Sequence, residues 1–363
     1  MADKLVSAED GTPLPMRVEV DLEVLINGKE RGHHHPVKPT AVSGGIGEEK
    51  TPPAFKFKSA GEAPETKTPK NDDCWAPKSV DILMVGKQFG DKNLTVLSVS
   101  ENNDVAVNVS YAIPKPKYHE SPKLVTVGSR IYTIGAVDAK HNAVEMLENG
   151  IWTMQKETMG KRTDGIVGYL RDQGLLFACF CAFNEACSRT CEFRKESDAH
   201  AVWETRQTPS NWQCLRNPSG VAFKGLIWVS GGQHCDKETK QLWSYDYNNN
   251  KWTEHASMRE ARRAHAMVVD CGTFVVCGGR NAASANLNTC ERYIPPDNNW
   301  QTMAALPQSG AKIGRVSLFA LSDRRLLMVQ QVDAHVYRNG SWSRVTIGRL
   351  CQSYPCYATM VPK

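Results

Sequence analysis

Four cysteines near the middle of the chain are the residues whose types and spacing first suggest chemistry. They form the pattern C-x-C-x5-C-x3-C over Cys179, Cys181, Cys187 and Cys191, in a chain with 12 cysteines. Such a cluster could bind zinc or form disulfides. The spacing is not the one common in zinc ribbons, however, and the nearest histidine is the distant His200.

Two features favour a different interpretation, in which these cysteines are small buried thiols. Cys179 and Cys181 lie in an apolar run that begins at Leu175, where a strand is expected. The chain also begins without the basic segment and apolar stretch of a secretory signal, which indicates a reducing compartment, where disulfides are rare. We therefore expect the cysteines to pack as small hydrophobic residues, and we expect no metal site and no cofactor.

Three adjacent histidines, His33–His35, could also be taken for metal ligands. Adjacent residues of a regular strand do not all face one ion, and Pro36 follows, so the run is interpreted as a flexible linker. The sequence has no P-loop, no dinucleotide-binding glycine pattern and no Gly-x-Ser-x-Gly turn. We therefore expect that the protein is not an enzyme.

Composition and charge narrow the classes of partner. The chain of 363 residues is 41% hydrophobic, has a mean hydropathy of −0.43, and has no apolar run near the ~20 residues of a membrane helix. The net charge of +5 is modest and no basic strand is rich in aromatic residues. These features predict a cytoplasmic protein that binds neither membranes nor nucleic acids.

Residues 1–73 differ from the rest. They contain eight of the 19 prolines and no Trp, Tyr or Cys, a composition that does not build a packed core. We expect a largely disordered N-terminal arm. Within it, residues 16–27 alternate apolar and acidic side chains and end at an Asn27-Gly28 turn, which predicts a strand that could dock on a sheet edge of this chain or of another copy.

Residues 74–363 repeat. Two stretches, 225–258 and 273–303, each contain a strand stopped by a glycine pair, then a strand carrying Tyr, then a strand carrying Trp. The glycine pairs begin 47 residues apart, at Gly231 and Gly278. The same period continues in the tryptophans, which are Trp152, Trp203, Trp252, Trp300 and Trp342. A fixed period near 50 residues indicates units that bury their apolar faces against one another.

The order of Gly-Gly, Tyr and Trp resembles the kelch repeat, strongly over 225–305 and weakly over the rest of 79–363. The resemblance implies an all-β fold, a six-bladed kelch-type β-propeller of four-stranded blades. The blades are expected at about 79–120, 121–163, 164–213, 214–263, 264–312 and 313–355. The first blade lacks an inner strand, which residues 356–363 are expected to supply, so that the C-terminal strand closes the ring.

The repeat residues themselves are assigned to the fold. Glycine pairs allow the backbone to turn or approach closely where a Cβ would collide. The rings of Tyr and Trp are expected to fill the space between adjacent blades. Function is therefore expected in the loops.

In kelch propellers one face is built from the loops after the glycine pair and from the segments after the Trp strand, and that face commonly binds a protein. The resemblance places a mostly basic set of candidate partner-binding residues there: Lys87, Gln88, Lys161, Arg162, Gln233, His234, Arg259, Arg262, Arg263, Arg280, Asn281 and Lys312. Residues 1–73 carry 10 Lys plus Arg and 13 Asp plus Glu, so that residues 74–363 hold a net charge of +8. This charge suits an acidic protein surface, although for each residue taken alone an ordinary solvated charge is the favoured interpretation.

Two functions fit these expectations. The layout resembles one propeller half of a scruin-type actin-crosslinking protein, which implies a cytoskeletal scaffold that binds or crosslinks actin filaments, with self-association through the N-terminal arm. The alternative is a substrate-recognition subunit of a ubiquitin ligase, or another kelch adaptor, that binds an acidic peptide. Residues 1–73 are too short and too polar for the BTB domain that such adaptors often carry, which favours the scaffold.

Overall fold

The computed structural model describes residues 80–85, 94–100, 105–107, 113–118, 122–135, 142–180, 189–209, 215–284, 286–307, 316–321, 324–329, 333–346 and 357–361. Two units are distinguished along the chain, Met1–Pro52 and Pro53–Lys363, and all described residues belong to the second. The predicted arm, its strand at 16–27 and the histidine run lie outside the described residues. In the described part of the chain, no helix combines the length and apolar character of a membrane span.

Within these ranges the strands form six antiparallel sheets of four strands each. Sheet 1 contains β27 (Tyr357–Val361), β1 (Val80–Val85), β2 (Thr95–Val99) and β3 (Val105–Val107). Sheet 2 contains β4 (Lys123–Val127), β5 (Arg130–Ile134), β6 (Val144–Glu148) and β7 (Ile151–Met154). Sheet 3 contains β8 (Ile166–Leu170), β9 (Leu175–Cys179), β10 (Thr190–Lys195) and β11 (Glu204–Gln207).

The other three sheets follow the same order from the inner to the outer strand. Sheet 4 contains β13 (Ser219–Phe223), β14 (Leu226–Ser230), β17 (Leu242–Asp246) and β18 (Lys251–His255). Sheet 5 contains β19 (Ala266–Asp270), β20 (Thr273–Cys277), β21 (Cys290–Ile294) and β22 (Asn299–Met303), with the 3-10 turn Pro295–Asp297 between its last two strands. Sheet 6 contains β23 (Ser317–Ala320), β24 (Leu326–Val329), β25 (Asp333–Arg338) and β26 (Ser341–Thr346).

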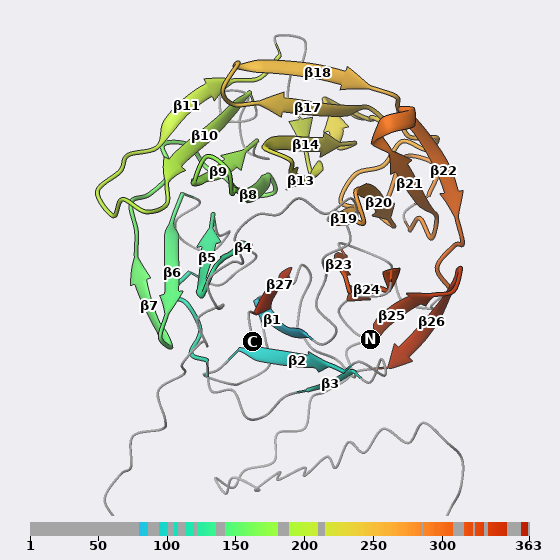
Figure 1. The fold of residues 1–363 in the computed structure, drawn as a ribbon, viewed down its shortest axis with the longest axis horizontal. Coiled ribbons are helices and arrows are strands. Elements are labelled where there is room, and N and C mark those ends of the chain that lie inside the picture. Colours follow the sequence, from blue (N-terminus) through green and yellow to red (C-terminus); the bar gives the residue numbers. More distant parts are fainter. Residues whose placement is uncertain are drawn as a thin grey trace, which may run out of the picture. The chain divides into compact units, whose positions relative to one another are not determined.

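The six sheets are arranged as the blades of a propeller (Figure 1). Each innermost strand contacts the innermost strands of two other sheets, in the cyclic order β27, β4, β8, β13, β19, β23 and back to β27. The C-terminal β27 pairs antiparallel with β1, from Asp81 opposite Val361 to Val85 opposite Tyr357. The predicted all-β propeller of four-stranded blades, with the C-terminal strand completing the first blade, is thus confirmed.

The repeated aromatic residues pack between neighbouring sheets, as expected. Tyr245 of sheet 4 lies in one buried cluster with Phe177 and Phe193 of sheet 3, and Tyr293 of sheet 5 lies in another with Trp228 of sheet 4. Four of the tryptophans also donate a hydrogen bond to a carbonyl oxygen that lies earlier in the chain. The indole nitrogens of Trp152, Trp203, Trp300 and Trp342 donate to the carbonyl oxygens of Pro114, Lys156, Ala256 and Ala304, at 2.7, 2.8, 2.7 and 3.1 Å. Sheets 2, 3, 5 and 6 are thereby each fastened to the segment that leaves the preceding sheet.

The glycine pairs sit where both conformation and space exclude a side chain. Gly231, Gly232, Gly278 and Gly279 have φ values of 54°, 102°, 69° and 88°, in the left-handed region that favours glycine. A Cβ on Gly279 would lie 2.6 Å from the carbonyl oxygen of Arg263. The close approach of backbone expected from the sequence is therefore present at the end of the second strand of sheets 4 and 5.

The cysteines correct one expectation. Cys179 and Cys191 are buried, as predicted, but they form a disulfide between β9 and β10, and Cys277 and Cys290 form the corresponding disulfide between β20 and β21. In each pair the two residues are directly opposite on adjacent antiparallel strands, with Cα atoms 4.0 and 4.3 Å apart. Two cysteines that lie opposite each other in a non-hydrogen-bonded pair of an antiparallel sheet are close enough to form a disulfide. The expectation of free thiols rested on the cellular compartment and took no account of this geometry. Cys181 and Cys187 lie outside the described residues.

A small three-stranded sheet was not predicted. It contains β12 (Leu215–Arg216), β15 (Gln233–His234) and β16 (Lys237–Glu238), in the order β12-β15-β16. β15 and β16 form a hairpin between the second and third strands of sheet 4, and β12 precedes the first strand of that sheet. Strands of two residues have no periodicity to detect, so the sequence carries little signal for them.

Candidate protein-interaction site

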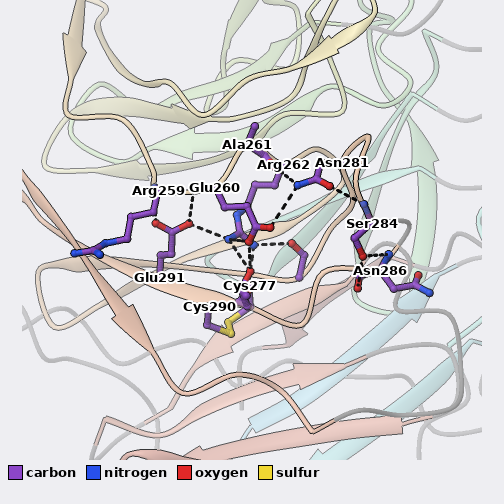
Figure 2. A network of polar contacts seen from close by, with 12 residues as sticks. Arg259, Glu260, Ala261, Arg262, Cys277, Asn281, Ser284, Asn286, Cys290 and Glu291 are labelled. Atoms are coloured by element: carbon purple, nitrogen blue, oxygen red, sulfur yellow. Dashed lines mark hydrogen bonds and ion pairs between the residues drawn. A yellow bond between two sulfur atoms is a disulfide. The ribbon is translucent and has the colours of Figure 1, made fainter.

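Arg262 was expected to bind a partner, but the structure places it in the interior. Its side chain is 0% exposed. The guanidinium donates hydrogen bonds to the carbonyl oxygens of Gly278 and Thr289, at 2.8 and 3.1 Å, and to the carboxylate of Glu291 at 2.9 Å. Figure 2 shows this network beside the disulfide between Cys277 and Cys290. Glu291 is in β21, and Gly278 and Thr289 are next to the ends of β20 and β21, so Arg262 fastens the segment after sheet 4 to sheet 5.

Arg162 occupies the corresponding place between sheets 2 and 3 and corrects the expectation in the same way. It is 1% exposed, and its guanidinium donates to the carbonyl oxygen of Thr190 at 3.0 Å and to the carboxylate of Glu192. A buried charge is tolerated when it is paired and hydrogen-bonded. Arg162 and Arg262 are therefore internal links, and neither is available to a partner.

The carboxylates that receive these arginines also hold backbone. Glu291 accepts hydrogen bonds from the amides of Arg259 and Glu260, at 2.7 and 3.2 Å. Glu192 accepts from the amides of Met159 and Gly160, both at 2.7 Å. Glu145 of sheet 2 does the same for Lys117 and Tyr118, at 2.8 and 2.9 Å. These three segments between sheets are thus held to the sheet that follows each of them.

Arg263 joins the loop ends of sheets 4 and 5. Its side chain donates to Glu238 at 2.9 Å and to Gln233 at 3.1 Å, both in the β15–β16 hairpin. Its backbone forms an antiparallel bridge with Arg280, with both N–H···O distances at 3.0 Å. Gln233, Arg263 and Arg280, which are predicted site residues from three segments of the chain, are therefore brought together.

Asn281, the residue after Arg280, shapes its own loop. Its side-chain nitrogen Nδ2 donates to the carbonyl oxygen of Ala261 at 3.0 Å (Figure 2). Its side-chain oxygen Oδ1 accepts from the backbone amides of Ala283 and Ser284 at 3.0 and 2.9 Å. This is the local turn that Asn side chains favour. Asn281 positions the loop in which Arg280 is exposed.

The predicted site residues also differ in exposure. Lys161, Arg259 and Arg280 are exposed, whereas Gln233, His234, Arg263 and Asn281 are half-buried. Lys161 lies between sheets 2 and 3, and the Arg259 guanidinium donates to the carbonyl oxygen of Trp300 at 3.3 and 3.4 Å. Lys87, Gln88 and Lys312 lie outside the described residues.

Three exposed basic residues near Arg263 were missed. Arg216 is paired with Gln233 in the three-stranded sheet, Lys237 is in β16, and Lys240 follows that strand. With Arg263 and Arg280 they form what we call the basic loop-end face: Arg216, Lys237, Lys240, Arg263 and Arg280. Asp236 and Glu238 lie in the same hairpin, so the face is mixed but mainly positive.

His265 lies behind this face, beside a cavity of about 210 Å³ lined by the inner strands. Its Nε2 is 2.8 Å from the hydroxyl of Ser230. Burial, followed by the charges of Arg262 and Lys123, holds the pKa of His265 well below its ordinary value of 6.5. His265 is therefore neutral at pH 7 and contributes no charge to the basic loop-end face.

Comparison with known proteins agrees with this architecture. The kelch motif matches residues 261–307, which run from the end of sheet 4 through sheet 5. Beta-scruin of Limulus polyphemus is 33% identical over 102 residues, which cover 25% of this chain and 11% of that protein. An F-box/kelch-repeat protein of Arabidopsis thaliana is 30% identical over 112 residues, covering 28% of this chain and 32% of that protein.

A third similar protein is Kelch-like protein 35 of Mus musculus, which is 34% identical over 91 residues, 25% of this chain and 15% of the relative. The chain thus spans between 11% and 32% of the length of these three relatives. The matched motif, the similar proteins and the six four-stranded sheets together support the assignment of this chain to the kelch-repeat family of β-propellers.

Proposed function

We propose that the protein is a non-enzymatic, cytoplasmic scaffold that binds actin filaments through the basic loop-end face. The observation that carries the proposal is the bridge between Arg263 and Arg280, which joins the loop ends of sheets 4 and 5. The bridge holds these two arginines together. Arg216, Lys237 and Lys240, which are exposed, add positive charge from neighbouring loops to the same face. Such a surface attracts an acidic partner and sets its orientation.

Two further points support binding of a protein. Kelch repeats are interaction modules, and one of the similar proteins is a scruin. The loop ends are also held by internal hydrogen bonds to Glu192 and Glu291, so that little conformational freedom is lost on binding.

Co-sedimentation with purified actin filaments tests the proposal. We expect pelleting at low salt that weakens at high salt, because exposed charges are screened within roughly 10 Å at 0.1 M ionic strength. Arg280→Glu should weaken pelleting, whereas the matched control Lys251→Glu, at an exposed position on the outer strand β18, should not. Absence of pelleting at both salt concentrations would remove actin as the partner.

Crosslinking needs a second contact, for which we propose self-association through the predicted strand at 16–27. Deletion of residues 1–73 should then abolish the bundling of filaments, seen as loss of low-speed pelleting, and leave high-speed pelleting of single filaments unchanged. Bundling that persists in the deleted protein would contradict this role.

A second candidate is supported by the similarity to an F-box/kelch-repeat protein and to Kelch-like protein 35. In this alternative the same face recognises an acidic segment of a substrate for a ubiquitin ligase. Affinity purification of the full chain from cells distinguishes the two functions. Recovery of cullin subunits together with loss of binding in Arg280→Glu would favour the adaptor, and recovery of actin alone would favour the scaffold.

A further inference from the structure

The junction between sheets 3 and 4 differs from two other junctions that the structure describes. At two sites an arginine four residues before the inner strand of a sheet enters that sheet: Arg162 precedes β8 and Arg262 precedes β19. The residue at the same place before β13 is Leu215, which is buried. Arg162 fastens sheet 2 to sheet 3, and Arg262 fastens sheet 4 to sheet 5. Between sheets 3 and 4 the apolar Leu215 stands in the place of this arginine.

The acceptor of that arginine is replaced as well. In sheet 3, Cys191 lies opposite Cys179, the last residue of the second strand, and the carboxylate of Glu192 comes directly after it. In sheet 5, Cys290 lies opposite Cys277 in the same way, and Glu291 comes directly after it. In sheet 4, Leu242 is opposite Ser230 and the next residue is Trp243. Both members of the buried ion pair have thus been exchanged for apolar residues.

The exchange coincides with a cavity. A space of about 270 Å³ is lined by the apolar side chains of Leu215, Val229 and Trp243, with His234, Thr239 and Gln241 contributing polar atoms. Gly231 also lines it, and Gly231 and Gln241 correspond to Gly278 and Thr289, whose carbonyl oxygens bind Arg262 in sheet 5. The space that a guanidinium fills in sheet 5 is therefore open in sheet 4.

Size and chemistry indicate what this cavity accepts. Its volume is below the roughly 300–1,000 Å³ of sites for small molecules and cofactors, and it suits a single side chain. A cation is disfavoured because the carboxylate that would neutralise it is replaced by Trp243, and a buried charge without a partner is costly. An aromatic side chain packs well against an indole ring and aliphatic walls, and a hydroxyl on it can bond to the polar atoms.

The surroundings add a preference for charge. Arg216, Lys237 and Lys240 of the basic loop-end face are exposed on the segments that also line the cavity. We propose that this cavity, at the loop end of sheet 4, binds an aromatic side chain carried by an acidic segment of a partner protein. This inference rests on the proposed function in that it names an anchor point on the same face, but it does not require actin as the partner.

Synthetic peptides test the proposal on the full-length protein. The probes are the acidic peptide DEDYDED, its alanine counterpart DEDADED and the uncharged SGSYSGS, with dissociation constants measured by fluorescence anisotropy of labelled peptides. We expect DEDYDED to bind at least about tenfold more tightly than either of the others, since an anchor residue in a pocket dominates such interfaces. Equal affinity for DEDYDED and DEDADED, or no binding of any peptide, would overturn the proposal.

A double variant that introduces the ion pair of sheet 5 into sheet 4 tests whether the peptide binds in this cavity. Leu215→Arg combined with Trp243→Glu rebuilds the pair that fills the equivalent space in sheet 5 and should abolish the preference for tyrosine. Thr239→Phe narrows the cavity from its half-buried rim and should have the same effect without a change in the interior charge. Circular dichroism and thermal unfolding check that each variant is folded. A folded variant of either kind that still prefers DEDYDED as the wild type does would contradict the assigned site.

The two proposals fail in distinguishable ways. If filaments pellet with the protein but the peptides do not discriminate, the cavity is not an anchor site and the scaffold function stands. If the peptides discriminate but filaments do not pellet, the anchor site stands and actin is not its partner.

Discussion

Sheets 4 and 5 have the same pattern of four strands and different loop ends. Both carry the glycine pair, the Tyr that bonds an Asn in a left-handed turn, and the Trp strand. Sheet 5 is closed by a disulfide at the end of its second strand and is linked to sheet 4 by the pair of Arg262 and Glu291. In sheet 4, Ser230 and Leu242 stand where sheet 5 has its two cysteines, and Leu215 and Trp243 stand where the ion pair of Arg262 and Glu291 would be. Sheet 4 also has an additional hairpin.

We infer from the difference how this repeat could divide stability and recognition between two sheets. Features that pack one sheet on the next are the same in both, because each sheet must bury the same faces. The loop ends are free to vary, and in sheet 4 they exchange internal links for a cavity and exposed charge. Sheet 5 is therefore expected to act mainly as support, and sheet 4 as the recognition unit.

The largest expected effect is the loss of one member of the buried pair. Glu291→Ala removes the buried carboxylate of the pair, so that Arg262 keeps only the half-buried Glu260 at 3.3 Å, and should lower the free energy of unfolding by about 3–5 kcal/mol, measured by urea denaturation. Arg262→Leu combined with Glu291→Trp copies sheet 4 and should cost much less, since a well-packed apolar replacement of an ion pair is often tolerated. A double variant as unstable as the single one would show that sheet 5 does not accept the arrangement of sheet 4.

The disulfide of sheet 5 should contribute the next largest effect. Replacing Cys277 and Cys290 together by serine should lower the free energy of unfolding by about 2–4 kcal/mol in the absence of reductant. The converse variant, Ser230→Cys with Leu242→Cys, places two cysteines directly opposite in sheet 4 and should form a bridge detectable by mass spectrometry. If no bridge forms under oxidising conditions, the two sheets differ in backbone as well as in side chains.

The dependence of stability on pH should report His265, which lies where sheets 4 and 5 meet. The pKa of His265 is held well below 6.5 in the folded protein by burial, so that below pH 6.5 the unfolded chain binds a proton that the folded one does not. Stability is then unaffected above this pH and falls by about 1.4 kcal/mol for each unit below it until the folded pKa is reached. His265→Gln should flatten the profile by this amount, and an unchanged profile would mean that other groups cause it.

The smallest effect is expected for the exposed charges. Arg280→Glu and Lys251→Glu should each change the free energy of unfolding by no more than about 0.5 kcal/mol, because both side chains are exposed. Only Arg280→Glu should reduce partner binding. A large loss of stability in Arg280→Glu, measured by thermal unfolding, would mean that the Arg280 side chain supports the fold rather than recognition.

The fold was readable from the sequence because its signals are local or periodic. A glycine pair after an apolar strand requires a left-handed backbone, and rings at a period near 50 residues must pack between units. Even the pairing of β27 with β1 could be inferred, since the first unit lacked an inner strand. These features depend on residue type and spacing, which the sequence displays directly.

The site was less readable because burial of a charge depends on distant partners. Arg162 and Arg262 look like loop residues in the sequence, and their carboxylates lie on the third strand of the following sheet. The signal was present in the repeat: Cys-Glu recurs at Cys191-Glu192 and Cys290-Glu291, each with an Arg at the same place before the unit. Comparing the units position by position would have identified both the ion pairs and the disulfides.

The pairing of β27 with β1 also has a consequence for biosynthesis. Asp81 and Val361 are neighbours in the sheet but are made at opposite ends of the described chain, so the first sheet cannot be completed until residues 357–361 have left the ribosome. Until then the inner edge of β1 has unpaired backbone groups, which other strands can bind. The contact also joins distant residues, and such contacts slow folding. Nascent chains of this protein are therefore expected to depend on chaperones for most of the time of their synthesis, and C-terminal truncations are expected to aggregate rather than to yield a smaller propeller.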